Sequence, residues 1–276
     1  MTLIRVAHSP DSDDAFMFYA LANGKLDTGD LEFEHVLSDI ETLNREAFQG
    51  TYEVTAISIH AFAYLDERYA LLDSGASMGD GYGPVLVARE EIAPERLTEV
   101  AVAIPGTLTS AALALKMWNP RLKTTVLPFD DIIPAVQDGR VDAGVVIHEG
   151  QLTWESDGLQ CLVDLGQWWA ERTGGLPLPL GGNVIRRDLG SETMARVAGL
   201  LRASIEYSLD HRDQALDHAL HYGRGLDRGK ADRFVGMYVN ELTVSYGERG
   251  RQAVRELLEQ AFQQRLIPRV PRLEFV

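Results

Sequence analysis

Residues 134–148 decide the fold: Pro134-Ala-Val-Gln-Asp-Gly-Arg-Val-Asp-Ala-Gly-Val-Val-Ile-His148 is typical of a helix end, a glycine turn and a buried strand ending in Ile-His. Residues 45–60, Arg45-Glu-Ala-Phe-Gln-Gly-Thr-Tyr-Glu-Val-Thr-Ala-Ile-Ser-Ile-His60, follow the same order. Upstream, residues 3–16 and 100–112 each read as a buried strand, a proline-containing turn and a polar helix N-cap. The repeat predicts two similar lobes whose strand ends and helix N-termini face one cleft.

The composition is that of a globular protein with an acidic surface. The chain has 276 residues, of which 45% are hydrophobic and 24% charged, so it can bury a substantial core. Its 41 acidic residues outnumber 26 Lys and Arg, and the net charge of −15 repels nucleic acid and anionic membranes. We therefore expect a small-molecule partner, which, if anionic, binds at a local exception to this field. The oligomeric state stays open.

The single cysteine, Cys161, excludes an intramolecular disulfide. Its apolar setting predicts a buried thiol, and no neighbouring cation favours a nucleophile. The N-terminus reads as a strand without signal-peptide features, and no apolar run reaches the length of a membrane span. We expect a cytoplasmic location.

Strands and helices alternate from the start, which predicts an α/β fold. In the first part of the chain, strands are predicted over 3–7, 31–37 and 54–58, helices over 14–21 and 40–48, and a glycine-rich loop over 73–84.

An inserted lobe is predicted between two crossing strands. Residues 84–89 form a strand that leaves the first lobe, and residues 182–186 form one that returns. This predicts a larger lobe made of 1–88 and 182–276, a smaller lobe made of 89–181, and a two-strand hinge. Such a two-lobed architecture is that of type II periplasmic binding proteins, in which hinge closure buries a ligand. The remaining predicted strands are 100–104, 124–127 and 141–147, and the remaining helices are 109–118, 131–137, 192–209, 230–240 and 248–264.

The turn at residues 105–111 is a candidate anion site. It follows a strand directly and carries the hydroxyls of Thr107, Thr109 and Ser110 beside the free N–H groups of a helix N-terminus. Plain N-capping by the same residues is the alternative. The lobe's place beside a cleft favours the site.

The acidic turn of the first lobe, residues 9–15, is its counterpart. Ser9, Asp11 and Asp14 are candidate cleft residues, and the carboxylates could hold a hard cation. A turn and helix cap, with aspartates favoured by the helix dipole, explains the pattern better. We predict no metal.

His148 ends an apolar strand and precedes Glu149, another candidate cleft residue. The carboxyl end of a strand is where open α/β sheets place ligands. The alternative is a partly buried histidine satisfied by a backbone carbonyl. His60 has the same ambiguity in the other half of the repeat.

Two further segments have structural explanations. The glycine-rich loop 75–83 lacks the spacing of phosphate-binding motifs, which favours a cleft rim or hinge loop that orders on closure. Trp168 and Trp169 lie in a predicted amphipathic helix, where core packing is favoured over an apolar wall for a ligand.

Seven short stretches along the whole chain are specific when taken together: Ser9–Tyr19, Glu41–Asn44, Ile147–Glu149, Asp164–Trp169, Leu176–Gly181, Arg186–Leu189 and Tyr238–Glu241. With them the chain resembles the menaquinone-biosynthesis family of the futalosine pathway, in its 1,4-dihydroxy-6-naphthoate synthase branch. The resemblance implies a two-lobed fold, no cofactor, and conversion of cyclic dehypoxanthine futalosine to 1,4-dihydroxy-6-naphthoate with release of the sugar-derived fragment.

The resemblance also implies roles for individual residues. The family's proton acceptor, the histidine of an Ile-His-Glu motif, falls on His148. Substrate contacts fall on the strand end Ala56-Ile57-Ser58 and on the hydroxyl pair Thr109-Ser110. Relatives often carry lysine at the position of Ala56, so a charge contact is expected to be missing here while backbone contacts remain.

The implied chemistry suits these residue types. Removing a proton from a ketone-activated carbon calls for a base near neutrality, which histidine supplies, and aromatisation of the ring provides driving force. Three alternatives remain open: chorismate dehydratase of the same pathway, a non-catalytic small-anion binding protein, and a ligand-sensing regulatory domain. Missing export features count against the second, and the absence of a basic DNA-reading segment counts against the third.

Overall fold

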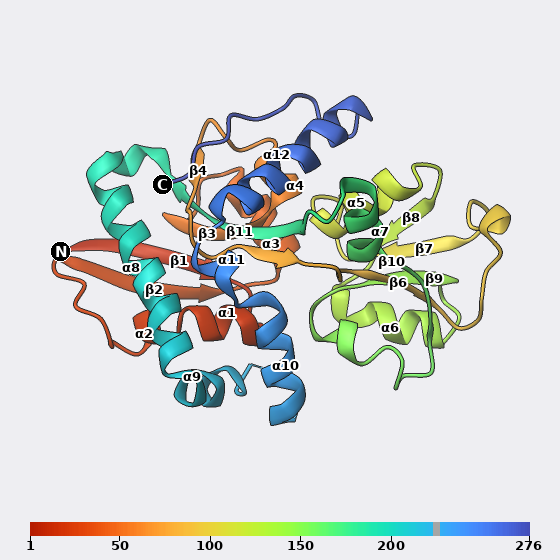
Figure 1. Ribbon diagram of the computed structural model, residues 1–276, viewed down its shortest axis with the longest axis horizontal. Coiled ribbons are helices and arrows are strands. Elements are labelled where there is room, and N and C mark those ends of the chain that lie inside the picture. The colour runs from red at the N-terminus through yellow and green to blue at the C-terminus, as the bar shows by residue number, and fades with distance from the viewer. Residues whose placement is uncertain (223–226) are drawn as a thin grey trace.

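The computed structural model describes residues 1–222 and 227–276. Within them, two β-sheets lie side by side along the long axis of the molecule, each with its own helices, and both labelled chain ends lie with the first sheet (Figure 1). We call the first sheet with its helices the first lobe, and the second sheet with its helices the second lobe. Both sheets mix parallel and antiparallel pairs, so the predicted α/β class is confirmed.

The first sheet has the strand order β2-β1-β3-β11-β4, with β5 paired to β11. Strands β1 to β3 are parallel, and β11 runs antiparallel to β3, β4 and β5. Its strands are β1 (Thr2–His8), β2 (Leu31–Leu37), β3 (Val54–Ser58), β4 (Tyr69–Leu71), β5 (Ser77–Gly79) and β11 (Leu178–Arg186). The short strand β5 corrects the prediction that 73–84 is loop throughout.

The second sheet has the order β10-β6-β9-β7-β8. Its strands are β6 (Val85–Ala88), β7 (Ala101–Ile104), β8 (Lys123–Val126), β9 (Ala143–Val146) and β10 (Gln160–Asp164). The predicted lobe boundary at residue 88 is therefore wrong for β6, because its four buried residues pair with β9 and β10. Whether the two sheets fold as separate domains stays a prediction.

The connections between the sheets lie elsewhere than predicted. Strand β6 lies within the second sheet, while Val184 and Ile185 pair with β3 and β4 inside the first. The paired strands at the junction are instead β5 and the start of β11, where Leu178 lies opposite Gly79. The β5/β11 pair therefore lies where the two-strand connection was expected, and its action as a hinge stays a prediction.

Twelve α-helices and three short 3₁₀ helices are found among the described residues. The first lobe has α1 (Ser12–Met17), α2 (Tyr19–Ala22), α3 (Ile40–Ala47), α4 (Ile59–Phe62), α8 (Gly190–Asp210), α9 (Arg212–Ala219), α10 (Arg228–Tyr238), α11 (Glu241–Val244) and α12 (Gly247–Gln263). The second lobe has α5 (Ser110–Trp118), α6 (Phe129–Gln137) and α7 (Leu165–Thr173), and the 3₁₀ helices are η1 (Pro94–Arg96), η2 (His148–Leu152) and η3 (Arg187–Leu189). The helix predicted over 14–21 is interrupted at Phe18. No helix of the described residues is long and apolar enough to cross a membrane.

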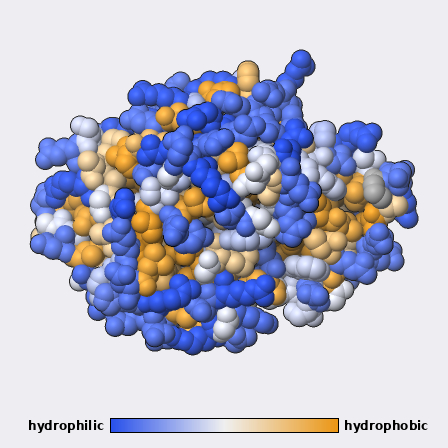
Figure 2. Space-filling model, in the orientation of Figure 1, coloured by the Kyte–Doolittle hydropathy of each residue, from blue (hydrophilic) through white to orange (hydrophobic). Residues whose placement is uncertain are grey.

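The largest hydrophobic core runs from the first sheet into the second and includes Trp169, which is fully buried. The indole N–H of Trp169 donates to the carbonyl of Pro177 at 3.0 Å, and Trp168 packs partly buried beside it. Both tryptophans are therefore core residues. Cys161 is exposed on the edge strand β10, so the predicted burial of its thiol is wrong. The face in Figure 2 is mostly hydrophilic, with hydrophobic residues in separate small groups.

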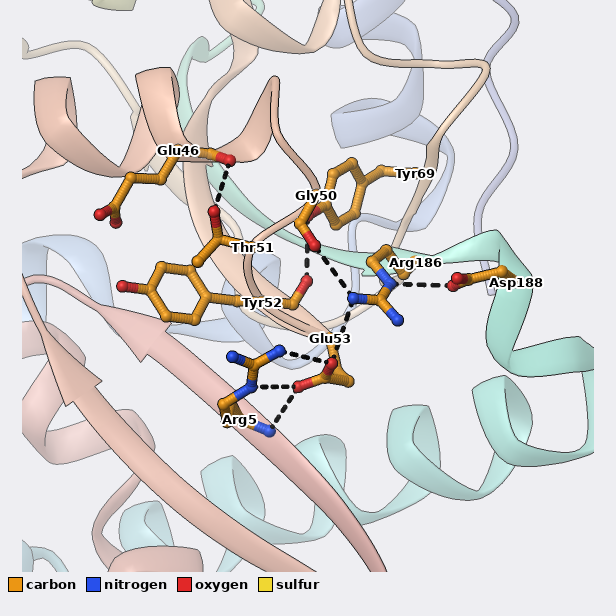
Figure 3. A network of polar contacts seen from close by, with 9 residues as sticks. All are labelled: Arg5, Glu46, Gly50, Thr51, Tyr52, Glu53, Tyr69, Arg186 and Asp188. Atoms are coloured by element: carbon orange, nitrogen blue, oxygen red, sulfur yellow. Dashed lines mark hydrogen bonds and ion pairs between the residues drawn. The ribbon is translucent and has the colours of Figure 1, made fainter.

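Glu53 anchors the end of the first sheet that lies away from Ser58 (Figure 3). Its carboxylate accepts two side-chain hydrogen bonds from Arg5, both 2.9 Å, and forms an ion pair with Arg186 at 3.1 Å. Burial raises the pKa of Glu53, but the hydrogen bonds and charge of Arg5 outweigh it and hold the pKa below its usual value. This network ties β1, β3 and β11 together and leaves the opposite strand ends for the site.

Candidate active site

A cavity of about 110 Å³ is lined by residues of both lobes. Its walls come from the turn after β1, the ends of β3 and β9, the N-terminus of α5, strand β11 and helix α10. The predicted site residues that line it are Ser9, Asp11, Asp14, Ala56, Ile57, Ser58, Thr109, Ser110 and His148. Thr107 and Glu149 do not line it.

His148 connects the two lobes. It follows β9, begins η2 and has a φ of 54°, in the left-handed region that non-glycine residues rarely occupy. Its Nδ1 lies 2.8 Å from Asp11 Oδ2, and its ring packs edge-on against Phe129 at a centroid distance of 4.8 Å. The other ring nitrogen, Nε2, is buried without a hydrogen-bond partner. A histidine oriented through Nδ1, with Nε2 unpaired, has the geometry of a general base.

Three carboxylates raise the pKa of His148. Burial lowers its pKa, but the charge and hydrogen bond of Asp11, with the charges of Glu149 and Asp13, outweigh burial and raise the pKa to about 9. The carboxylates respond in turn, because burial and the charges of Asp11 and Glu149 raise the pKa of Asp13 to about 7. Burial, with the charges of Asp13 and Asp11, raises the pKa of Asp14 as well. The pKa of His148 thus lies above the near-neutral value expected from its residue type.

The side chains of the acidic turn, residues 9–15, make their polar contacts around the cavity rather than at the N-terminus of α1. Asp11 occupies the N-cap position of α1, yet its side chain makes no capping hydrogen bond. Its Oδ2 instead accepts from the hydroxyl of Ser9 and from His148, while the backbone N–H of Ser9 donates to Asp14 at 2.8 Å. The interpretation of Asp11 as a cap is therefore wrong. No group of His, Cys, Asp or Glu in residues 1–222 and 227–276 has the arrangement of a metal site.

The N-terminus of α5 offers N–H groups more than hydroxyls. Thr109 is the N-cap: its hydroxyl accepts from the N–H of Ala112 at 3.1 Å and donates to the carbonyl of Gly106 at 2.9 Å. The hydroxyl of Ser110 donates to the carbonyl of Leu180 at 2.5 Å. The first N–H groups of a helix have no intrahelical carbonyl, so those of Ser110 and Ala111 remain to attract an anion.

Thr107 is exposed at the rim rather than in the cavity. Its hydroxyl accepts from Arg45 at 3.5 Å, and the neighbouring N–H of Leu108 donates to Glu41 at 3.2 Å. The turn before α5 therefore faces helix α3 of the first lobe. Contact with α3 explains why the predicted hydroxyl of Thr107 is not available to a ligand in the cavity.

The end of β3 is held from below by a buried amide. The backbone N–H of Ser58 donates to Asn44 Oδ1 at 2.8 Å, and Asn44 Nδ2 donates to the hydroxyl of Ser58 at 3.1 Å. Asn44 belongs to α3 and is fully buried. Its two bonds fix the position of Ser58 in the cavity wall.

Five polar residues of the lining were not predicted as site residues from the sequence: Asp13, Ser77, Gln151, Asn183 and Tyr238. The hydroxyl of Tyr238 donates to Gln151 Oε1 at 2.7 Å, and Asn183 Nδ2 donates to the carbonyl of Gly75 at 3.2 Å, which leaves the buried Asn183 Oδ1 without a partner. Tyr238 lies in one of the stretches that carry the family resemblance, which was the available signal. Asn183 gave none, because its strand reads as ordinary sheet.

Fold and cavity together define a class of protein: a two-lobed α/β protein of the periplasmic-binding-protein type, with a cavity lined by residues of both lobes. Solved structures support the class. The alkanesulfonate-binding protein SsuA of Xanthomonas axonopodis, bound to MOPS, has a TM-score of 0.74 at 12% identity, over 100% of this chain and 99% of that one. At such low identity the likeness concerns the fold alone.

The family follows from closer relatives. The family described as "Menaquinone biosynthesis" matches residues 4–263, and the chain belongs to it. Proteins named "1,4-dihydroxy-6-naphtoate synthase" are 38% identical over 100% of both chains in Thermus thermophilus, and 36% identical over 96% of this chain and 95% of the relative in Streptomyces coelicolor. A solved protein of Archaeoglobus fulgidus is 51% identical, with a TM-score of 0.92 over 96% of this chain and 98% of that one. The resemblance in the sequence motifs is confirmed.

Proposed function

We propose that this chain converts cyclic dehypoxanthine futalosine to 1,4-dihydroxy-6-naphthoate, with His148 as the general base. The observation that carries the proposal is the orientation of His148, whose Nδ1 contacts Asp11 while Nε2 is unpaired on a residue that lines the cavity. The names of the two curated relatives supply the reaction.

In this proposal the Nδ1–H of His148 donates to Asp11, and Nε2 takes the proton from the carbon activated by the substrate's ketone. The electron pair left on that carbon drives expulsion of the sugar-derived fragment, and the ring then becomes aromatic. Asp11 stabilises the imidazolium that forms when Nε2 is protonated. Because His148 must be neutral to accept the proton, and its pKa is about 9 when Asp11 contacts it, kcat is expected to rise with pH up to that value.

The substrate's carboxylate is assigned to the N-terminus of α5. The N–H groups of Ser110 and Ala111 lie at the positive end of the helix dipole, in the wall of the cavity. Thr109 acts there by capping the helix. The end of β3, residues 56–58, lines the same cavity and is proposed to contact the ring system. Ala56 supplies no charge there, so the affinity for the anion rests on α5.

The reaction is tested by incubating the purified protein with cyclic dehypoxanthine futalosine and, separately, with the precursor used by chorismate dehydratase, followed by mass spectrometry. Turnover of the first substrate alone supports the proposal. Turnover of the second would assign the chain to the sister reaction, and binding without turnover of either would indicate a binding protein. We propose catalysis without a cofactor, and the cytoplasm as its location, as suits a family of biosynthetic enzymes.

A further inference from the structure

Three pairs of residues join the η2 segment of the second lobe to the first lobe through polar contacts. Asp11 contacts His148 at 2.8 Å, and the hydroxyl of Ser12 donates to Glu149 at 3.2 Å. One turn further on, the hydroxyl of Tyr238 donates to Gln151 at 2.7 Å. The candidate base therefore lies in one lobe, and the carboxylate that orients it lies in the other.

The carboxylate of Asp11 is prepared by its own turn. Asp11 is 1% exposed, and its Oδ2 accepts from the hydroxyl of Ser9 as well as from His148. The N–H of Ser9 is in turn fixed by Asp14. The hydrogen bonds from Ser9 to Asp11 and to Asp14 lie within the first lobe, so the turn itself contributes to holding the acceptor.

We propose that Asp11 is a positioning residue for His148, and that their contact forms only when the two lobes close, so that closure itself prepares the base. The proposal rests on the proposed role of His148 in the reaction. Separation of the lobes exposes His148 to water, where its pKa returns toward about 6.5 and neither ring nitrogen is selected. Closure brings Nδ1 to Asp11 and leaves Nε2 as the acceptor of the substrate's proton.

Other charges around His148 must be separated from the effect of Asp11. Asp13 and Asp14 face it from α1, Glu149 is its neighbour in η2, and Tyr238 approaches η2 from α10. Glu149 moves with His148 in the second lobe, so its charge acts in both the open and closed arrangements. Asp13 and Asp14 belong to the same lobe as Asp11 and approach His148 together with it on closure. The effect of Asp11 must therefore be measured against that of a neighbouring aspartate.

The test is histidine NMR of the full chain, with the His148 signal identified by its absence in His148→Asn. The ring shifts are followed against pH in the wild type, Asp11→Asn and Asp13→Asn, each with and without 1,4-dihydroxy-6-naphthoate. We expect this product to raise the His148 pKa in the wild type. In Asp11→Asn, the pKa of His148 with product bound should be about one to three units lower than in the wild type, so that the product-induced rise disappears. Asp13→Asn, the same change two residues away, should keep the Nδ1 contact and most of the rise.

Turnover adds a second measurement. Asp11→Asn should lower kcat by about a hundredfold or more, with little change in KM, and should move the acid limb of the pH profile of kcat to lower pH. Ser12→Ala, which removes the neighbouring contact between the lobes, should change KM without moving that limb. Ser9→Ala keeps the Asp11 carboxylate and replaces Asp11→Asn in the test if that variant does not fold. It should shift the pKa of His148 in the same direction by a smaller amount.

A product-induced rise that persists in Asp11→Asn would come from the product's own charge and would overturn the proposal. So would an unmoved pH profile in Asp11→Asn, or in Ser9→Ala if that variant replaces it. These outcomes are distinct from failure of the proposed function, because the NMR experiment needs no turnover. The wild type could fail to turn over cyclic dehypoxanthine futalosine while Asp11→Asn abolishes the product-induced shift of His148. That result would refute the proposed reaction and support the positioning of His148 by Asp11.

Discussion

His60 and His148 end matching segments of the two halves of the repeat, and each has a buried Nε2 without a hydrogen-bond partner, yet the partner of Nδ1, the nearby charges and the access to the cavity differ. The ring Nδ1 of His60 donates to the carbonyl of Thr109 at 3.2 Å, and burial lowers its pKa. His60 does not line the cavity, and Ser58, two residues earlier, does. His148 lines the cavity beside carboxylates that raise its pKa to about 9.

A repeated sequence thus gives the same local backbone in both halves, but it does not determine the chemical role of the histidine at the end of each segment. Both histidines follow a buried strand at its carboxyl end. His60 then enters helix α4 and faces the N-terminus of α5, whereas His148 leaves its strand with a left-handed φ and faces the acidic turn. The neighbours contributed by the opposite lobe make one histidine structural and the other a candidate base.

The largest expected effect comes from replacing the two histidines separately. His148→Asn keeps a side chain of similar size and removes its basicity, so kcat should drop by about a hundredfold or more. His60→Asn should cost far less, because the ring of His60 contacts the backbone carbonyl of Thr109 and does not itself line the cavity. Steady-state kinetics of both variants decide the matter. An active His148→Asn with an inactive His60→Asn would reverse the assignment of the two halves.

Two hydroxyls near the N-terminus of α5, those of Ser110 and Thr107, should differ in their effect on product affinity. Ser110→Ala removes a hydroxyl that donates to Leu180 and accepts from the N–H of His60, so the wall of the cavity should loosen. At about 1 kcal/mol per hydrogen bond, product affinity should fall roughly fivefold to tenfold. Thr107→Ala is the matched control at the exposed rim and should change affinity less than about twofold. Calorimetric titration with the product measures both, and equal losses would place the rim in the site after all.

The histidines also predict opposite pH dependences of stability in the two lobes. Burial and the neighbouring charge of His35 lower the pKa of His8 to about 3, and burial lowers that of His35 to about 4. Both stay neutral in the folded protein, so their stabilisation is present above pH ~6.5 and is lost as the unfolded chain binds protons at lower pH. The raised pKa of His148 works the other way: its stabilisation is present below pH ~6.5 and is lost as pH rises through about 9.

Urea unfolding of the wild type and of His35→Gln, at pH 6.5 and 5, measures the first-lobe effect. The variant should lose less stability on acidification, by up to about 2 kcal/mol, because one titrating group has been removed. Taking the difference between two proteins cancels the carboxylates, which titrate in both. Equal losses in the two proteins would show that His35 protonates freely in the folded state.

The smallest expected effect concerns the acidic turn, which has no acidic counterpart in the second half of the repeat. If its aspartates position His148 rather than hold a cation, activity should survive exhaustive chelation unchanged. Turnover before and after treatment with EDTA is the measurement. Loss of activity that Mg²⁺ or Mn²⁺ restores would overturn this interpretation and make the two halves differ in metal chemistry as well.

Much of the fold could be predicted from periodicity. The strands 31–37 and 54–58 were predicted with the bounds that the structure has, because alternating or continuous apolar residues between turn signals leave little choice. The strand 85–88 was predicted as a strand but placed in the wrong lobe. Sequence indicates that a segment is extended and buried, but the pairing partner of a strand depends on contacts distant along the chain.

The site residues likewise fall into those that the local sequence predicted and those that only long-range contacts placed in the cavity wall. The candidate residues at the strand ends and at the start of α5 reached the cavity wall because strand ends and helix N-termini are local features. Asn183 and Gln151 were missed because nothing local distinguishes a polar residue that faces a cavity from one that faces water. Thr107 was predicted in the site but lies outside the cavity lining, where its hydroxyl contacts Arg45 from a helix of the other lobe.

By itself, the sequence determined the alternation of strands and helices, the repeat, the acidic surface and, through its motifs, the family. These properties follow from short-range patterning and composition. Only the tertiary structure decided that the Asp11 side chain contacts His148 rather than capping its helix, and that His148 rather than His60 lines the cavity. The physical reason is that a side chain's pKa and hydrogen bonds depend on what lies within a few ångströms of it, and here those neighbours are brought from 137 residues away by the packing of one lobe against the other.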